Sequence, residues 1–298
     1  MVSGLRDTRS DNKVKSIYNV VKAKSGCLMN DKIAVIGAGM MGGAIVKSLL
    51  KSGYAGKITA VDIQPERLRE QEKIGVAVST DNRKVAAEAD VIFVCVKPNN
   101  VETVLKQINN STKGKLVISI AATVPLKFLK KFIPEAKIVR IMPNLAALVQ
   151  ASYTAYCCGE NVTKKDKEKV QSLLNSMGVC EEVDEKYMDA ITALTGSGPG
   201  YISIIIEALM DAGVKVGLPQ KVALQGAAQA VLGTGKLMLE LQKNPAKLRD
   251  MVATPGGTTI EAINTLEEST IRQTLMQAVE KATKKSQLIR EKLGINSE

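Results

Sequence analysis

The residues best suited to chemistry lie in a glycine-rich segment, residues 36–42, which reads Ile-Gly-Ala-Gly-Met-Met-Gly and contains the spacing G-x-G-x-x-G. In this pattern the first glycine permits a tight turn, the second lets a pyrophosphate approach the backbone, and the third lets a helix pack against a strand. The helix N-terminus directs unpaired N–H groups at the phosphates. We therefore predict a dinucleotide site that includes Gly37, Ala38, Gly39, Met40, Met41 and Gly42.

The segments around this motif support the prediction. A strand-like run, residues 32–36, precedes it, a helical pattern follows, and a second strand-like run ends near Asp62. A carboxylate at this place accepts hydrogen bonds from the ribose hydroxyls of NADH and repels the 2′-phosphate of NADPH. Arg67, five residues on, could turn towards a 2′-phosphate and partly offset this repulsion, but Arg67 and Arg69 are expected to begin a solvated helix face. We therefore predict that Asp62 binds coenzyme, and that NADH is modestly preferred while NADPH is accepted.

Two further strand ends are expected at the same edge of the sheet. Val96, Lys97 and Pro98 follow a buried run at residues 91–95, and Ala122 follows the next strand-like run. Open α/β sheets bind ligands outside the carboxyl ends of their strands. We assign Val96, Lys97, Pro98 and Ala122 to the coenzyme site, since small or cationic side chains there suit a flat, anionic ligand.

A second constellation, residues 254–261, reads Thr-Pro-Gly-Gly-Thr-Thr-Ile-Glu. Thr258 and Glu261 have the spacing of a capping box, so Thr258 is predicted to be the N-cap of a helix. Gly256 and Gly257 would leave backbone N–H groups accessible for a small carboxylate. Thr259 would direct its hydroxyl into the same space.

The composition excludes several classes of function. The chain of 298 residues contains no histidine, so Ser-His-Asp hydrolysis, Cys-His proteolysis and His-ligated zinc are excluded. Five cysteines without a C-x-x-C spacing indicate small core residues in a reducing cytoplasm, and no metal site. The net charge of +11 comes with only 3% aromatic residues, which disfavours nucleic-acid binding. The longest apolar runs are too short for a membrane span.

The pattern of elements indicates two domains after a polar, basic segment at residues 1–28, which is expected to be a disordered arm or a misassigned start. A transit peptide is disfavoured by Asp7 and Asp11. Strand-like runs alternate with amphipathic helices up to residue 184, which predicts a Rossmann-type domain with a parallel sheet and right-handed crossovers at residues 29–184. The last strand is expected at residues 179–183. Residues 185–298 carry only helical patterns. The predicted fold class is therefore α/β, with an all-helical second domain.

The helical patterns at residues 202–216 and 222–232 are apolar on more than one face. A helix that is apolar all round in so small a domain needs further burial. We therefore predict that the second domain forms a homodimer, with higher oligomers left open.

Together, these motifs resemble the pyrroline-5-carboxylate reductases from about Met29 to Leu293. The most specific parts are residues 192–219, TALTGSGPGYISIIIEALMDAGVKVGLP, and residues 250–263, DMVATPGGTTIEAI. They follow a Rossmann-type segment that carries VKP, IAA and MPN. The resemblance implies NAD(P)H-dependent reduction of 1-pyrroline-5-carboxylate to L-proline, although many members of the family use NADPH.

The resemblance also implies site residues. It adds Asn82 to the coenzyme site, and it places substrate near Glu185, Gly200, Gly256, Gly257, Thr258 and Thr259. Thr259 is the candidate catalytic residue, because its hydroxyl could orient the ring nitrogen. Two positions depart from the family pattern: Gln242 stands where an acidic substrate contact can occur, and Met251 where a coenzyme-side asparagine can occur. These two residues are left out of the site.

Two other functions remain open on the residues alone. A 3-hydroxyacid dehydrogenase would share the Rossmann start and the helical second domain, but would need a catalytic lysine where this chain has residues 196–207, GSGPGYISIIIE. A non-catalytic dinucleotide sensor would leave the glycine turn at residues 254–259 without a purpose. Oxidation of the coenzyme on addition of the imine distinguishes an active reductase from a sensor.

Overall fold

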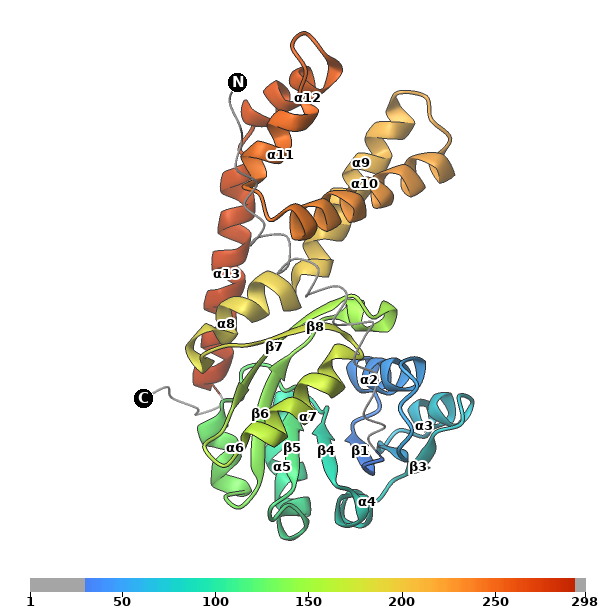
Figure 1. Ribbon diagram of the computed structural model, residues 1–298, viewed down its shortest axis with the longest axis vertical. Helices are drawn as coiled ribbons and strands as arrows, with labels where there is room; N and C mark the ends of the chain where they lie inside the picture. Colours follow the sequence, from blue (N-terminus) through green and yellow to red (C-terminus); the bar gives the residue numbers. More distant parts are fainter. Residues whose placement is uncertain (1–29, 293–298) are drawn as a thin grey trace, which may run out of the picture. The chain divides into compact units, whose positions relative to one another are not determined.

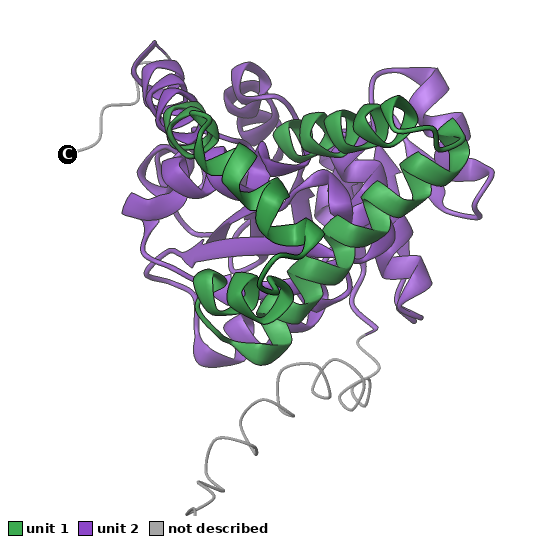
Figure 2. Ribbon diagram, turned by 90° about the horizontal axis from the view of Figure 1, so that it is seen from above, with its two compact units in different colours: residues 1–25, 200–278 green, residues 26–199, 279–298 purple. Residues whose placement is uncertain are grey.

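The computed structural model describes residues 30–292, and the predicted basic arm at residues 1–28 lies outside them. The chain forms two compact units, coloured separately in Figure 2. The larger one, here called the sheet unit, contains the described residues before Gly200 and those from Val279 onward. The other, the helical unit, contains residues 200–278.

The sheet unit is built on an eight-stranded sheet in the order β3-β2-β1-β4-β5-β6-β7-β8, labelled in Figure 1. Strands β1 to β6 are parallel. The strands span Ile33–Ile36 (β1), Ile58–Val61 (β2), Ala77–Ser79 (β3), Val91–Val94 (β4), Leu116–Ser119 (β5), Lys137–Met142 (β6), Ser152–Cys158 (β7) and Gly178–Glu182 (β8). The predicted α/β architecture is confirmed, and β3 is a strand that the sequence pattern did not reveal.

Helices cover both faces of this sheet. On one face, α2 (Met40–Lys51), α3 (Pro65–Glu72) and α7 (Lys164–Asn175) pack on alternate strand residues such as Val35 and Phe93. On the other, α4 (Asn82–Glu88), α5 (Pro98–Ile108) and α6 (Leu126–Phe132) pack on the intervening residues, such as Ile36 and Val94. Because both faces are covered, the central strands β1, β4 and β5 are buried at every position, as is typical of parallel sheets.

The predicted parallel sheet has one exception at β7, which runs antiparallel to β6. A parallel crossover needs about a dozen residues or more. The connection between these strands, residues 143–151, is shorter and contains only the 3-10 helix Leu145–Val149. Strand β8 is in turn parallel to β7, with α7 as the crossover.

After β8 the chain forms a series of short helical segments within the sheet unit. A 3-10 turn at Glu185–Tyr187 leads into α8 (Met188–Ile191), and a π-helical turn at Thr192–Gly196 follows. The compact sheet unit continues past residue 184, where the domain boundary is predicted, and ends at Pro199. The boundary after residue 184 therefore stays a prediction.

The last helix, α13 (Ile271–Lys292), begins in the helical unit and ends in the sheet unit. Its C-terminal half is fixed to α8 by Asp189, which is 5% exposed. The carboxylate accepts hydrogen bonds from Ser286 Oγ at 2.7 Å and from Arg290 Nη1 at 2.7 Å. A buried ion pair therefore joins the last helix to the sheet unit.

The helical unit contains α9 (Gly198–Lys215), which starts in the sheet unit, with α10 (Gln220–Leu241), α11 (Pro245–Val252), α12 (Thr258–Glu267) and the start of α13. Many large apolar side chains of α9 and α10 are exposed in the single chain, among them Ile204, Val214, Leu232 and Leu239. Among the described residues, no helix has the length and apolar character that a membrane crossing needs.

The ion pair of Asp189 predicts a large effect on stability. In Asp189→Ala, the mostly buried guanidinium of Arg290 loses its carboxylate, and breaking such a pair costs about 3 kcal/mol or more in free energy of unfolding. Ser286→Ala removes one neutral donor and should cost about 1 kcal/mol. Denaturant unfolding of both variants at one protein concentration measures the difference. Equal losses would mean that the Arg290 pair contributes little.

Candidate coenzyme and substrate sites

The candidate coenzyme site lies where the strand order reverses, between β1 and β4. Gly37 follows β1 with φ of 100°, and a Cβ atom added to it would lie 2.6 Å from the carbonyl oxygen of Cys95. A Cβ on Gly42 would lie 1.9 Å from the carbonyl oxygen of Gly37. Only glycine fits at these two positions, so the roles predicted for them agree with the local geometry.

A cavity of about 730 Å³ opens beside this turn. Predicted coenzyme residues that line it are Gly37, Gly39, Met40, Met41, Asp62, Asn82, Val96 and Lys97. The turn and the start of α2 form one side of the cavity, and residues of α5 contribute Asn100, Thr103 and Gln107. The volume and the glycine cradle fit a dinucleotide.

The other predicted coenzyme residues do not line this cavity. Ala38 and Gly42 are buried in the turn beneath it, and Pro98 forms the first turn of α5. Ala122 lies beyond the carboxyl end of β5 and is half-buried against a separate apolar cluster with Met142 and Met188. Asn82 donates from Nδ2 to Gln107 Oε1 at 2.7 Å, which links α4 to α5 at the edge of the cavity.

Asp62 holds the glycine turn as well as lining the cavity. Its Oδ2 accepts the backbone N–H of Ala38 at 2.9 Å, and its Oδ1 accepts that of Gln64 at 2.9 Å. The residue is 7% exposed. Most of the hydrogen-bonding capacity of the carboxylate is therefore used within the protein.

Arg67 is the residue that the sequence interpretation underestimated. Its side chain is 43% exposed, in agreement with the expected solvated helix face, but its Nη1 also donates to Asp62 Oδ2 at 3.2 Å and it lines the cavity. Its guanidinium also lies over Gly39, since Nη1 would be 3.6 Å from a Cβ there. The cavity thus contains a cation next to the carboxylate that was predicted to repel a 2′-phosphate.

The second constellation forms the turn between α11 and α12. Gly256 has φ of 67°, and the N–H of Gly257 donates to the carbonyl of Thr254 at 3.0 Å. The prediction that Thr258 is the N-cap was wrong. Gly257 is the N-cap residue, Thr258 is the first helical residue, and no side chain caps the helix.

Because the cap is a glycine, the first N–H groups of α12 receive no side-chain acceptor. Thr259 is half-buried in this first turn, and Thr258 is exposed. The turn therefore presents backbone donors and the threonine side chains of the first helical turn, without a cationic side chain.

The remaining predicted substrate residues have different surroundings. Glu185 Oε1 accepts Arg140 Nη1 at 3.0 Å and the N–H of Leu126 at 2.8 Å. The carboxylate therefore neutralises a guanidinium that is 1% exposed, a structural task that the sequence pattern did not indicate. Gly200 is exposed in the first turns of α9.

The four cysteines among the described residues lie in or against apolar clusters, in agreement with the interpretation as core residues, and Cys27 lies outside the described residues. Burial raises the pKa of the Cys157 thiol to about 12 and that of the Cys158 thiol to about 11. It also raises the pKa of Cys95, which lines the cavity. At neutral pH these thiols are protonated and poor nucleophiles.

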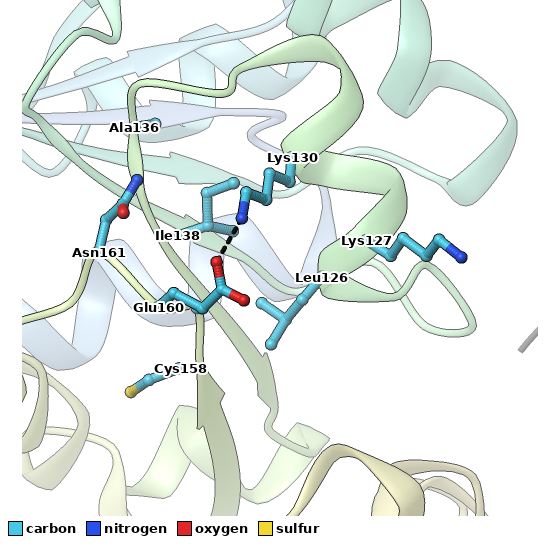
Figure 3. Close-up of a pocket in the computed structure, with 9 residues that line it drawn as sticks. Leu126, Lys127, Lys130, Ala136, Ile138, Cys158, Glu160 and Asn161 are labelled. Carbon is cyan, nitrogen blue, oxygen red and sulfur yellow. Dashed lines mark hydrogen bonds and ion pairs between the residues drawn. The ribbon is translucent and has the colours of Figure 1, made fainter. Parts of the chain in front are cut away.

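A smaller cavity of about 290 Å³ lies along α6 and the end of β7 (Figure 3). Leu126, Ala136 and Ile138 contribute apolar side chains, and an ion pair between Lys130 and Glu160 crosses it. None of the predicted site residues lines this cavity.

The reversal of strand order, the glycine turn and the cavity define a dinucleotide-binding protein of the Rossmann type, the architecture used by NAD(P)-dependent oxidoreductases. Residues 185–289 match the family model described as pyrroline-5-carboxylate reductase dimerisation, and residues 32–123 match the model described as NADP oxidoreductase coenzyme F420-dependent.

The pyrroline-5-carboxylate reductase of Methanosarcina acetivorans is 42% identical over 86% of this chain and 97% of its own length. That of Pisum sativum is 39% identical over 85% and 94%. The crystal structure of the Plasmodium falciparum pyrroline carboxylate reductase with NADP bound is 30% identical, covers 89% of this chain and 100% of that one, and has a TM-score of 0.80. The chain belongs to the pyrroline-5-carboxylate reductase family, a family of oxidoreductases.

The pair of Asp62 and Arg67 predicts opposite changes in coenzyme selectivity. Asp62→Ser removes a negative charge from the cavity and should move the ratio of kcat/KM for NADPH over NADH towards NADPH. Arg67→Ala removes the cation and should move it towards NADH. We expect shifts of about tenfold each.

Comparing the two coenzymes on the same variant cancels any general weakening of the glycine turn. Both ratios come from initial rates of coenzyme oxidation. If neither ratio moved by more than twofold, the two side chains would not face the ribose.

Proposed function

We propose that this chain catalyses the reduction of 1-pyrroline-5-carboxylate to L-proline, the last step of proline synthesis, with NADH or NADPH as hydride donor. The similarity to the Methanosarcina acetivorans reductase carries the proposal, because it extends over 97% of that protein's length. The aligned family models also include both the glycine-rich turn at residues 37–42 and the turn at residues 254–259.

The sheet unit would bind the coenzyme mainly through its backbone. Gly37, Gly39 and the start of α2 would receive the pyrophosphate, while Lys97 and Asn82 line the same cavity. When bound, the reduced coenzyme supplies the hydride that the imine carbon accepts. For the choice of coenzyme, the modest preference for NADH predicted from Asp62 is retained as part of the proposal, with Arg67 opposing it.

The turn at residues 254–259 would bind the substrate carboxylate. The uncapped N–H groups of α12 and the positive end of its dipole favour an anion there. Thr259 would orient the ring nitrogen through its hydroxyl. Glu185 and Gly200 remain in the proposed substrate site, Glu185 with its side chain already joined to Arg140.

A protonated cyclic imine is a good electrophile, and its reduction yields the amine without a separate acid. The iminium carbon gains a hydride, and the electron pair of the C=N bond moves to nitrogen, which keeps its proton. Position and electrostatics can then provide most of the catalysis. This chemistry suits a chain without histidine.

We also propose a homodimer formed through the helical unit, in the cytoplasm. The match of residues 185–289 to a dimerisation family supports the dimer, as do the exposed apolar side chains of α9 and α10. Leaving such surface in water costs about 25 cal/mol per Å². The thiols of Cys95, Cys157, Cys158 and Cys180 are unpaired, which is consistent with a reducing compartment.

The decisive assay mixes the purified full chain with 1-pyrroline-5-carboxylate and either reduced coenzyme, and follows absorbance of the coenzyme together with formation of proline. We expect stoichiometric oxidation and L-proline formation. Binding of coenzyme without turnover would support a dinucleotide sensor. Turnover only with 3-hydroxyacids would support a dehydrogenase of that class.

Thr259→Ala should lower kcat about 10- to 100-fold, because one oriented hydrogen bond to the reacting ring is lost. The Kd for coenzyme, measured by fluorescence, should stay within twofold. Thr259→Ser keeps the hydroxyl and should retain most of the activity. Thr265→Ala, on the exposed part of the same helix, is the matched control. Unchanged kcat in Thr259→Ala would remove this residue from the mechanism.

The proposed dimer predicts that light scattering gives at least twice the 31.9 kDa mass of the chain. A double variant, Ile204→Glu with Leu232→Glu, places charges on exposed apolar positions of α9 and α10 and should dissociate it. Val149→Glu, at an exposed apolar position of the sheet unit, is the control and should keep the native mass. A stable wild-type monomer at micromolar concentration would contradict the proposal.

A further inference from the structure

The π-helical turn at Thr192–Gly196 lies directly before Gly198-Pro199-Gly200, where the sheet unit ends and α9 begins. The N–H of Ser197 donates to the carbonyl of Thr192 at 2.9 Å, which closes the wide turn. Such π-helical turns are rare and occur frequently at functional sites. This one ends four residues before Gly200, which belongs to the proposed substrate site.

Pro199 creates a specific problem in this segment. In an α-helix the carbonyl of Thr195 would accept the N–H of the residue four positions later, which is Pro199, and proline has no N–H. A buried carbonyl without a donor is costly. Thr195 is half-buried, so a donor from elsewhere in the fold stabilises this segment.

Asn144 supplies that donor. Its Nδ2 donates to the carbonyl of Thr195 at 3.0 Å across 51 residues of sequence. The asparagine follows β6, at the carboxyl edge of the sheet where the coenzyme cavity opens.

The orientation of the Asn144 side chain is fixed by its other contacts. Its Oδ1 accepts the N–H of Ala146 at 3.1 Å, and its backbone N–H donates to Ser152 Oγ at 3.1 Å. Met142 packs nearby, since its Sδ would be 3.5 Å from a Cβ on Gly196. With Oδ1 and the backbone held in this way, Nδ2 is directed at one carbonyl.

We infer that Asn144 is a positioning residue for the substrate, acting through the carbonyl of Thr195 on the backbone that leads to Gly200. The inference rests on the proposed function, because Gly200 is a proposed substrate contact. Asn144 itself touches neither the glycine turn at residues 37–42 nor, within the contacts of the described residues, the residues that line the large cavity. Its loss should therefore affect imine binding and leave coenzyme binding intact.

The test compares Asn144→Ala and Asn144→Asp with wild type. Asn144→Asp keeps an acceptor for Ala146 but replaces the donor by an oxygen facing the Thr195 carbonyl. We expect the KM for 1-pyrroline-5-carboxylate to rise about tenfold in both variants, with coenzyme Kd within twofold. Thr163→Ala is the control for a general loss of stability. It removes the side-chain N-cap of α7, at the opposite end of the strands from Asn144. An unchanged KM, or an equal rise in Thr163→Ala, would overturn the inference.

Pro199→Ala provides a rescue. It restores an N–H four residues after Thr195, so the double variant Asn144→Ala with Pro199→Ala should recover at least half of the lost imine affinity. Equal KM values in Asn144→Ala and the double variant would mean that the Thr195 carbonyl is not the target.

Hydrogen exchange separates this inference from the proposed function. Asn144→Ala should speed exchange of the backbone amides in residues 196–204 at least fivefold, while those of α2 keep their rate. If wild type fails to reduce the imine, the proposed function fails. Unchanged exchange in an active enzyme would instead contradict the role of Asn144 alone.

Discussion

The close approach of the β1–α2 turn to the end of β4 is the constraint on which the coenzyme half of the molecule depends. Gly37 and Gly42 remove the two Cβ atoms that would collide with backbone carbonyls at 2.6 and 1.9 Å. Because the turn is tight, the N-terminus of α2 faces the reversal point of the sheet, and the cavity of about 730 Å³ forms beside it. Asp62 then fixes the turn by accepting the N–H of Ala38.

The hydrogen bond between Asp62 and Ala38 shows which features of the site the sequence can predict and which it cannot. The position of Asp62 at the end of β2 follows from spacing alone, and so do those of Gly37, Gly39, Met40 and Met41 beside the cavity. The groups that bind the Asp62 carboxylate cannot be predicted in this way. The N–H of Ala38 is 24 residues away in the sequence, and Arg67 donates to the carboxylate from α3. A carboxylate interpreted from sequence as an open acceptor is instead largely satisfied inside the protein, and its charge is accompanied by a guanidinium.

The other differences between the sequence-based predictions and the structure also come from long-range interactions or from competing local ones. The direction of β7 was within reach of the sequence, since residues 143–151 are too few for a parallel crossover. The partner of Glu185 was not, because Arg140 lies 45 residues earlier in the middle of a strand that reads as apolar. At Thr258 the capping-box spacing is present, but Gly256 and Gly257 complete the turn first, so the helix begins one residue earlier than that pattern requires.

Both proposed binding sites would recognise anionic groups through backbone N–H groups at helix N-termini, α2 for the coenzyme and α12 for the substrate. Backbone donors have no side-chain entropy to lose and no pKa to shift, so they suit a reaction that needs a fixed electrostatic field more than proton transfer. Backbone recognition also requires glycine where the ligand approaches. The two turns and the helix starts that follow them contain five glycines: Gly37, Gly39, Gly42, Gly256 and Gly257. Recognition by backbone explains how a chain without histidine can carry out this reduction, since the cyclic iminium already holds the proton that a general acid would otherwise deliver.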